Sequence, residues 1–407
     1  MKLSIPVNKP IFLFYGDVIK SHGTTTYLSS LIKYIGCAWT TMDSLFLQAF
    51  LPNSEDCLKA PGLPHLLKAP FTILYPYIPK IIWRLYELFY CYVKFCKRLL
   101  QKDSIGLKTF FISGETLLPL VFLCKLMGYQ SVYVKMGIIE ELLSSNNKLP
   151  YLKYLFLHAL EINCLNKFDI IIVVSEGMRQ YIHDKYRVSP NNIITLPCAV
   201  DQEICRYKPI PCMEIRKKLG LENRLVFVYC GIYAPWQCIQ ETIACFKLLK
   251  KLEKKAFFLI LSPDVEIFNS YLTGIDHSDY RVLFVEHSLI DQYLSAADAG
   301  FLLRKYNIIN QVASPLKFSE YLICGLPVII GPKVGDFSEL VMKEGIGVVL
   351  DPNNLNKWGN KLSPFLKKIS HDRENIRMSC IQIAINKLSW QAISYRVKKL
   401  QDKISFR

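Results

Sequence analysis

The sequence repeats one pattern from end to end: short, unbroken apolar runs separated by stretches with helical periodicity. Residues 170–174 read IIIVV, without the polar alternation of a strand that has one face in water. Strands covered on both faces are typical of parallel sheets flanked by helices, so the pattern predicts an α/β protein. The expected strands are residues 11–15, 109–113, 131–134 and 169–174, and then 225–230, 256–261, 281–285, 299–303, 327–330 and 347–350.

The expected strands form two series, and the stretch between them is not periodic. Pro197, Pro209 and Pro211 punctuate that stretch, which we interpret as a hinge. We therefore predict two α/β domains, over residues 1–200 and 201–387. A helix over about residues 388–407, after Trp390, is expected to return to the N-terminal domain.

Charge and composition limit the kinds of partner. The 407 residues include 50 Lys and Arg against 34 Asp and Glu, and the net charge of +16 favours a phosphate-bearing substrate, an acidic lipid surface or nucleic acid. The apolar runs are shorter than the roughly 18 residues that span a membrane. Residues 1–16 are interpreted as a first strand and not as a signal peptide. The 14 cysteines form no CxxC pair and favour a reducing cytoplasm.

The most informative segment is residues 314–330, SPLKFSEYLICGLPVII. Ser314 is a good N-cap, Pro315 suits the first helical position, and Gly325 is expected to end the helix before a strand. The start of such a helix binds anions through its free N–H groups, and Lys317 adds a cation there. Glu320, one turn later, is placed to accept hydrogen bonds from vicinal hydroxyls such as those of a ribose. The alternative is a capped core helix with a local Lys–Glu pair.

Residues 312–341 resemble the donor-site segment of family 4 retaining glycosyltransferases of GT-B fold. The resemblance is to the bacterial surface-polysaccharide branch, which reads SPxKFxEYLxxGLPVI. Further segments resemble this family in the same order along the chain: VVSEGMRQYI (173–182), LPCAVD (196–201), residues 228–249, ADAGFLL (297–303) and a terminal SWQ that contains Trp390.

The resemblance implies a GT-B fold, with two Rossmann-like domains facing a cleft. It also implies a retaining, hexosyltransferase-type enzyme that needs no metal or other cofactor. The N-terminal domain would take the acceptor, and the C-terminal domain a UDP- or GDP-linked sugar. The acceptor would be a saccharide, expected to be lipid-linked, in cell-surface polysaccharide synthesis. The residues implied are Lys317 and Arg304 for catalysis; Gly23, Gly231, Ser314, Pro315, Leu316, Lys317 and Glu320 for the donor; and His22, Glu140, Glu141 and His158 on the acceptor side.

The chain departs from the family pattern at three places. Val312 replaces the first of two glutamates, which usually helps to hold the donor sugar. The loop over residues 232–238 lacks the usual Arg and Lys, and Gln237 stands near the position of that Lys. Arg304, with its neighbour Lys305, is placed either to supply the missing charge or to lie in a solvated loop.

The third departure is Met136, which replaces a basic residue in VKMG (134–137). These departures keep open a second class of function, a catalytically impaired GT-B scaffold or regulatory partner. A third class, a nucleic-acid-binding protein, is opposed by the donor segment and by the lack of a nucleic-acid motif.

Two histidine-containing segments of the N-terminal half complete the predicted site. In residues 16–27, GDVIKSHGTTTY, a helix is expected to start near Thr24, with Gly23 in a loop that faces the cleft and His22 beside it. His158 and Glu161 lie one helical turn apart. They are expected to line the cleft or to brace it, and bracing is the preferred role for His158.

A basic and aromatic segment runs from Lys80 to Lys102. At helical spacing its basic residues fall on one stripe and its aromatic residues on the other side. This pattern is typical of a helix on an anionic membrane surface, and equally of an N-terminal-domain helix packed on the sheet. We predict a protein of the cytoplasm that is peripheral to the membrane.

Overall fold

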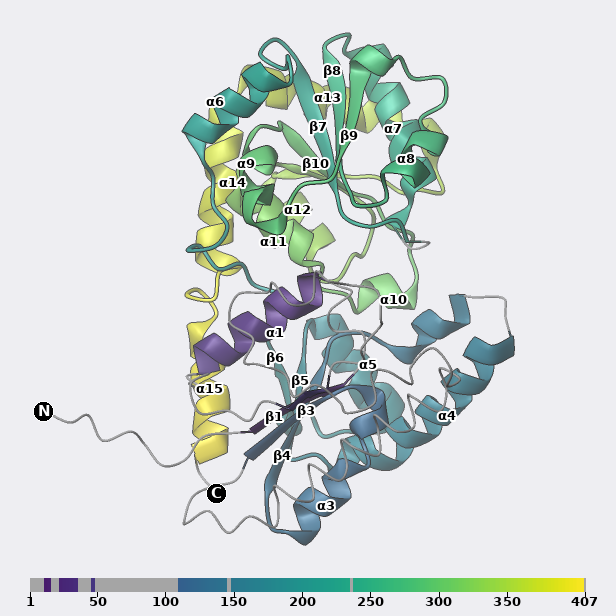
Figure 1. The fold of residues 1–407 in the computed structure, drawn as a ribbon, viewed down its shortest axis with the longest axis vertical. Helices are drawn as coiled ribbons and strands as arrows, with labels where there is room; N and C mark the ends of the chain where they lie inside the picture. The colour runs from purple at the N-terminus through teal and green to yellow at the C-terminus, as the bar shows by residue number, and fades with distance from the viewer. Residues whose placement is uncertain are drawn as a thin grey trace, which may run out of the picture.

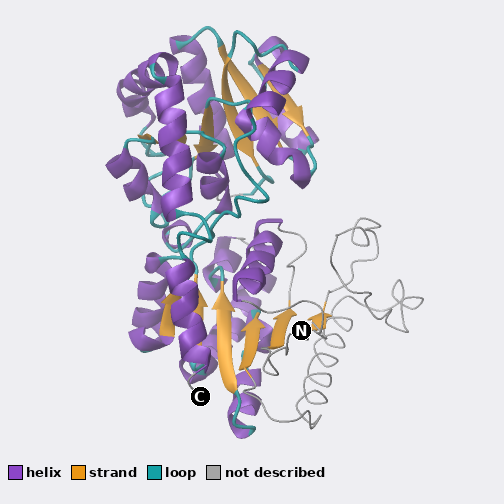
Figure 2. Cartoon of the chain, turned by 90° about the vertical axis from the view of Figure 1, so that its left-hand side faces the viewer, coloured by secondary structure: helices purple, strands orange, loops and turns teal. Residues whose placement is uncertain are grey.

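The computed structural model describes residues 11–15, 22–35, 45–47, 109–144, 148–234 and 237–405. Within these residues two six-stranded sheets form, and every pair of neighbouring strands in them is parallel. The sheet from the N-terminal half lies in the lower part of Figure 1 and the other sheet in the upper part. Figure 2 shows their strands in orange with helices packed around them.

The first sheet has the strand order β2-β1-β3-β4-β5-β6, so the direction of winding reverses between β1 and β3. Its strands are β1 (Ile11–Tyr15), β2 (Leu45–Leu47), β3 (Thr109–Ser113), β4 (Gln130–Lys135), β5 (Ile170–Val173) and β6 (Ile193–Thr195). Every residue of β3, β4, β5 and β6 is buried, as expected of strands that are covered on both faces.

The second sheet has the order β12-β11-β10-β7-β8-β9 and reverses between β7 and β10. Its strands are β7 (Leu225–Cys230), β8 (Ala256–Leu261), β9 (Tyr280–Leu283), β10 (Ala299–Leu302), β11 (Val328–Ile330) and β12 (Gly347–Val349). In parallel sheets ligands bind beyond the carboxyl ends of the strands at such a reversal. Gly231 follows β7, and Arg304 lies two residues beyond β10, so both lie at this point.

The strand predictions agree closely with the structure. The bounds of β1, β3, β7 and β8 are those expected, and the other predicted strands shift by at most two residues at an end. The strands β2 and β6 were not predicted. Each has three residues, as have β11 and β12, which were predicted.

Helices flank both sheets. The N-terminal half contributes α1 (His22–Ile35), α3 (Leu120–Leu126), α4 (Lys148–Cys164) and α5 (Glu176–Tyr186). The C-terminal half contributes α6 (Pro209–Lys218), α7 (Ile239–Leu252), α8 (Val265–Tyr271), α9 (Ile290–Ser295), α10 (Ile308–Gln311), α11 (Leu316–Ile323), α12 (Phe337–Glu344), α13 (Trp358–His371), α14 (Arg373–Lys387) and α15 (Ser394–Ser405). Short 3-10 helices lie between them, of which η4 (Glu115–Leu117), η5 (Ile139–Ser144) and η10 (His287–Leu289) concern the site.

The chain passes twice between the two halves. Residues 196–208 lead from β6 toward α6, and Val200 forms a parallel bridge with Ser389 on the return. Trp390 then stacks on Tyr34, with ring centroids 5.1 Å apart, and α15 packs against α1 and β6. In Figure 1 the yellow α15 lies beside the purple α1, next to the first sheet. The exact domain boundary near residue 200 stays a prediction.

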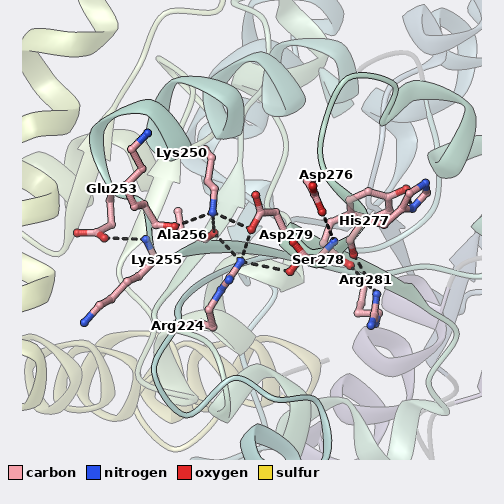
Figure 3. Close-up of polar contacts among 12 residues, drawn as sticks. Arg224, Lys250, Glu253, Lys255, Ala256, Asp276, His277, Ser278, Asp279 and Arg281 are labelled. Carbon is pink, nitrogen blue, oxygen red and sulfur yellow. Dashed lines mark hydrogen bonds and ion pairs between the residues drawn. The ribbon is translucent and has the colours of Figure 1, made fainter.

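The amino ends of the second sheet are joined by a polar network. Asp279, just before β9, accepts hydrogen bonds from Arg224, which precedes β7, and from Lys250 at 2.7 Å (Figure 3). Because ligands bind at the opposite, carboxyl edge, we assign this network a structural role.

Candidate active site

The helix α11 begins one residue later than predicted. It starts at Leu316 with Pro315 in the N-cap position, and no side chain caps it. Ser314 is therefore not the cap. Its Oγ accepts a hydrogen bond from the backbone N–H of Cys198 at 3.1 Å, and Ser319 donates to the Cys198 carbonyl at 3.0 Å. The segment after β6 thus occupies Ser314, and the first N–H groups of α11 have no side-chain acceptor among the residues that the structure describes.

The end of α11 follows the prediction. Gly325 has a φ of 81°, a backbone angle that favours glycine. Its N–H donates to the Leu322 carbonyl at 2.9 Å, and the N–H of Leu326 donates to the Tyr321 carbonyl at 2.9 Å. These are the two bonds of a Schellman motif, and they direct the chain into β11.

Lys317 lies in the first turn of α11 against the end of β7. Its Nζ donates to Gln237 Oε1 at 3.2 Å and lies 4.8 Å from the centre of the Tyr229 ring. A Cβ added to Gly231 would lie 2.3 Å from the same Nζ, at a φ of 138°. Gly231 therefore provides space for the lysine amine, a role that its place in the sequence did not reveal.

Arg304 lies on the neighbouring strand end and is only 7% exposed. One guanidinium nitrogen donates to Asn310 Oδ1 at 3.3 Å, whereas its Nε is buried without a hydrogen-bond partner. Arg304 is therefore buried beside the site and does not lie in a solvated loop. Lys305 instead points to Glu241, at 3.1 Å, and is half exposed. Within the described residues, neither Arg304 nor Lys317 forms an ion pair with a carboxylate.

The two cations are close enough to affect each other. Burial, together with repulsion from Arg304, lowers the pKa of Lys317 to about 7. Burial also lowers the pKa of Arg304. Two cations held together beside an uncapped helix N-terminus form a site that an anion would stabilise, because it would neutralise the repulsion and accept the free donors.

Glu320 follows Lys317 by three residues and is largely buried. Burial raises its pKa to about 7, although the attraction of Lys317 opposes the shift. Its Oε1 lies 3.9 Å from His287 Nε2, in η10. Burial lowers the pKa of His287, and Asp291 opposes this. His287 is a neighbour of Glu320 that sequence analysis missed, because 33 positions separate them in the chain.

The predicted acidic pair lies in η5 of the N-terminal half, and its two members differ. Glu140 accepts hydrogen bonds from Tyr181 at 2.6 Å and from Lys185, which leaves its Oε2 buried and unpaired. Burial raises the pKa of Glu141, Glu115 adds to the rise, and Arg304 opposes it. Glu141 therefore lies within electrostatic reach of the cation from the second sheet, whereas Glu140 is part of a local network.

A buried ion pair lies at the end of β4. Lys135 and Glu161 are 1% and 0% exposed, with Nζ and Oε1 2.5 Å apart, and Tyr186 also donates to Glu161. Glu115, which follows β3 and is partly exposed, lies 3.6 Å from the same Nζ. Sequence analysis noted Glu161 but not Lys135, and the available signal was its position directly after the apolar run of β4.

The remaining predicted residues lie in two helices. The helix α1 starts at His22, two residues before the expected start near Thr24, so Gly23 lies in its first turn and the prediction that Gly23 lies in a loop is wrong. The helix itself contacts α11. His158, on α4, stacks on Tyr154 at 5.5 Å and meets the edge of Tyr186 at 6.3 Å. These aromatic contacts fit the bracing role.

Val312 occupies the position of the missing glutamate and is buried in the apolar core of the first sheet. Its carbonyl accepts a hydrogen bond from Ser175 at 2.7 Å. Nearby, Asp336 accepts one from the backbone N–H of Glu176 at 3.1 Å. The segment around Val312 therefore fastens the second sheet to the start of α5.

Comparisons with known proteins agree with this architecture. Residues 213–386 match the family model described as glycosyl transferases group 1. No curated protein matches the chain. Sucrose-phosphate synthase (tll1590) from Thermosynechococcus elongatus is similar at a TM-score of 0.66 and 16% identity, over 98% of this chain and 99% of that chain. Anabaena Alr3699/HepE in complex with UDP and glucose is similar at a TM-score of 0.66 and 15% identity, over 97% of this chain and 100% of that chain. WaaG, a glycosyltransferase involved in lipopolysaccharide biosynthesis, is similar at a TM-score of 0.58 and 15% identity, over 80% of this chain and 83% of that chain.

The protein thus has the GT-B fold, with two Rossmann-like domains, as the sequence predicted. The second of these domains contains the group 1 glycosyltransferase match and the Lys317 site. Together these findings support a glycosyltransferase of GT-B fold.

We expect the affinity for a nucleotide sugar to fall as the pH rises through about 7. In the protein without ligand Lys317 has a pKa of about 7. A bound diphosphate would raise that pKa by stabilising the charged amine. Below the free pKa the amine is already protonated and affinity is greatest. Above it, binding takes up a proton, and affinity falls by up to about tenfold per pH unit. Calorimetric titration with UDP-glucose measures this change in affinity. Both ends of its diphosphate are esterified, so the diphosphate itself does not change charge near pH 7.

Glu320 loses a proton over the same range, so a variant must separate the two groups. We expect Glu320→Gln to keep the downward slope and Lys317→Met to remove it. A slope that survives in Lys317→Met would assign the titration to another group.

Proposed function

We propose that this protein transfers a sugar from a UDP- or GDP-linked donor to a saccharide acceptor, with retention of configuration. The observation that carries the proposal is the pair of buried cations at the reversal of the second sheet. Lys317 and Arg304 lie there without a carboxylate partner among the described residues, beside the uncapped start of α11. A diphosphate supplies the missing negative charge, and Glu320 is placed to accept hydrogen bonds from the ribose.

The proposed chemistry depends on charge stabilisation and positioning. Negative charge develops on the leaving diphosphate, where Lys317, Arg304 and the N–H groups of α11 stabilise it. In a front-face reaction the leaving phosphate takes the acceptor proton, so no nucleophile from the protein is needed. The protein then contributes mainly by holding donor and acceptor in a reactive geometry.

The acceptor is proposed to bind on the N-terminal domain, opposite those cations. Glu141 and the first turn of α1, with His22 and Gly23, are the candidate contacts. Glu140 and His158 support that surface through their local networks. The resemblance to family 4 implies a lipid-linked saccharide in cell-surface polysaccharide synthesis, and a place at the inner face of the membrane.

A screen of nucleotide sugars by thermal shift, beginning with UDP-glucose, tests the donor. A ligand that binds only the folded protein raises its melting temperature by mass action. Hydrolysis of the best ligand, with and without EDTA, then tests the enzyme. We expect hydrolysis to persist in EDTA, since the resemblance implies no metal. The absence of any stabilising nucleotide sugar would contradict the proposed function.

A second candidate is a catalytically impaired scaffold. The observation that favours it is Val312, whose side chain is buried in the N-terminal core in place of a glutamate. A scaffold would bind the nucleotide sugar in the thermal-shift screen without hydrolysing it or transferring its sugar.

Membrane association through residues 80–102 also stays a proposal. That segment lies outside the described residues. Within the described part of the chain, no helix has both the length and the apolar character needed to cross a bilayer.

A further inference from the structure

Glu320, the proposed ribose contact, lies beside a histidine from another element of the second domain. Its side chain is 14% exposed, and its Oε1 lies 3.9 Å from Nε2 of His287. The chain reaches this histidine by leaving β9 at the carboxyl edge of the sheet and forming η10. At that distance the two groups attract each other as ions but form no hydrogen bond. Their contact is therefore favourable mainly when both are charged.

The surroundings of His287 contain a second carboxylate, on α9. Asp291 is buried and forms an ion pair with Lys208 at 2.8 Å. Burial lowers the pKa of His287, and Asp291 opposes this. Because Asp291 is already paired with a lysine, its charge stays constant near neutral pH. The group whose charge changes beside His287 in this range is therefore Glu320.

Glu320 faces one cation on its own helix and several neutral groups on other elements. Lys317 attracts it, but burial prevails and raises its pKa to about 7. The other titratable groups within its electrostatic reach are Cys198, Cys205, Cys230 and Tyr321. Burial raises the pKa of each, and for Cys205 the contact with the Cys324 thiol raises it more than burial does. They are thus uncharged near pH 7 and leave Lys317 and His287 as the groups that affect Glu320.

We propose that His287 is a positioning residue, which takes up a proton when Glu320 gives one up to accept the hydroxyls of a ribose. A protonated carboxyl group uses one oxygen as a donor, whereas a carboxylate accepts at both oxygens. Vicinal hydroxyls therefore favour the carboxylate, and the imidazolium stabilises it. The proton moves from an oxygen of Glu320 to a ring nitrogen of His287, so none is released. This inference rests on the proposed function in one respect, the contact between Glu320 and the ribose.

The pair has a consequence for the pH dependence of binding. A lone Glu320 has its pKa raised to about 7 in the unliganded protein, and the ribose would lower it again. Affinity would then be lost as the pH falls through 7, by up to about tenfold per pH unit. With His287 present, the pair contains one proton before and after binding just below pH 7. The affinity should therefore stay nearly constant on that side.

Calorimetric titration of the full chain at pH 6 and pH 8 tests the proposal, with UDP-glucose or the nucleotide sugar that the thermal-shift screen selects. The test variant is His287→Asn, which keeps a polar side chain that does not titrate. The matched control is His371→Asn, at an exposed position on α13. Dissociation constants are compared as the ratio of variant to wild type, because the effect of Lys317 on the pH dependence cancels in that ratio.

We expect the ratio for His287→Asn to be near one at pH 8 and roughly ten at pH 6. The ratio for His371→Asn should be near one at both. In a Glu320→Gln background, His287→Asn should leave the pH dependence unchanged, since the carboxyl group is gone. A ratio for His287→Asn that is the same at both pH values would overturn the proposal, as would a pH effect that persists in the Glu320→Gln background.

The His287 ring can also be titrated in the unliganded protein. Its C2–H proton NMR signal is assigned by its loss in His287→Asn. We expect the ring to lose its proton at a higher pH in the wild type than in Glu320→Gln, because ionised Glu320 stabilises the imidazolium. Equal titration in the two proteins would overturn the proposal. Failure of every nucleotide sugar to bind the wild type would count against the proposed function, and the ring titration would still decide whether the pair shares a proton.

Discussion

Replacing Lys317 by alanine is expected to weaken nucleotide-sugar binding by about 1.5–3 kcal/mol, roughly 10- to 150-fold in the dissociation constant. The variant removes a charged hydrogen-bond donor from the proposed diphosphate site and leaves Arg304 alone there. Calorimetric titration measures the change. Lys343→Ala, at an exposed position on α12, is the matched control and should leave the affinity unchanged.

The stability of the unliganded protein distinguishes this role from a structural one. The pKa of Lys317 is lower in the folded protein than its ordinary value of 10.5, so folding disfavours the charged amine. Removing the side chain therefore should not lower the melting temperature of the unliganded protein. It should abolish most of the rise in melting temperature that the nucleotide sugar causes. A lower melting temperature with unchanged affinity would make Lys317 a structural residue.

Gly231→Ala tests the same contact without removing the charge. The added methyl would lie 2.3 Å from Lys317 Nζ, so the amine must move. We expect weaker binding than in the wild type, with the pH dependence retained because the lysine is still present.

The largest loss of stability is expected for Glu161→Gln. This nearly isosteric change leaves Lys135 charged and fully buried, without its carboxylate at 2.5 Å. Burial lowers the pKa of Lys135, but attraction to Glu161 and Glu115 outweighs this and raises it overall. Breaking a buried pair from one side typically costs about 3–5 kcal/mol in the free energy of unfolding. Urea denaturation, followed by circular dichroism, measures the change.

Two controls make the result specific. The double variant Lys135→Met with Glu161→Leu removes both charges and should recover much of the loss, because apolar residues replace buried pairs well. Arg179→Ala breaks an exposed pair with Glu176 and should cost under about 1 kcal/mol. A double variant as unstable as Glu161→Gln would mean that packing around Tyr186, and not the loss of the Glu161 charge beside Lys135, causes the instability.

Local sequence patterns were sufficient for the strands and for the orientation of α11. Unbroken runs such as LVFVYC and AFFLIL gave the bounds of β7 and β8 because burial on both faces leaves a continuous apolar signature. Lys317 and Glu320 share a face because of helical periodicity, and Gly325 ends the helix because its backbone needs a positive φ. Each of these signals lies within a few residues of the feature that it predicts.

The cap of α11 shows where such local reasoning fails. Ser314 has the residue type of an N-cap, but the backbone of Cys198 lies next to it in the fold and donates to its Oγ. The competing partner is 116 positions away in the sequence, so no propensity at residues 314–316 contains it. Tertiary contact overrode a local preference worth about 1 kcal/mol.

What only the tertiary structure decided is the set of contacts between distant segments. The sequence by itself determined two parallel sheets and a cationic helix start that follows one strand and precedes another. The meeting of Lys317 with Gly231 and Arg304 depended on the reversal of strand order, which brings the ends of β7 and β10 together. The burial of Val312 in the first sheet and the Lys135–Glu161 pair likewise join elements from separate stretches of chain. A local pattern reports whether a side chain is buried, whereas only packing selects which buried groups meet.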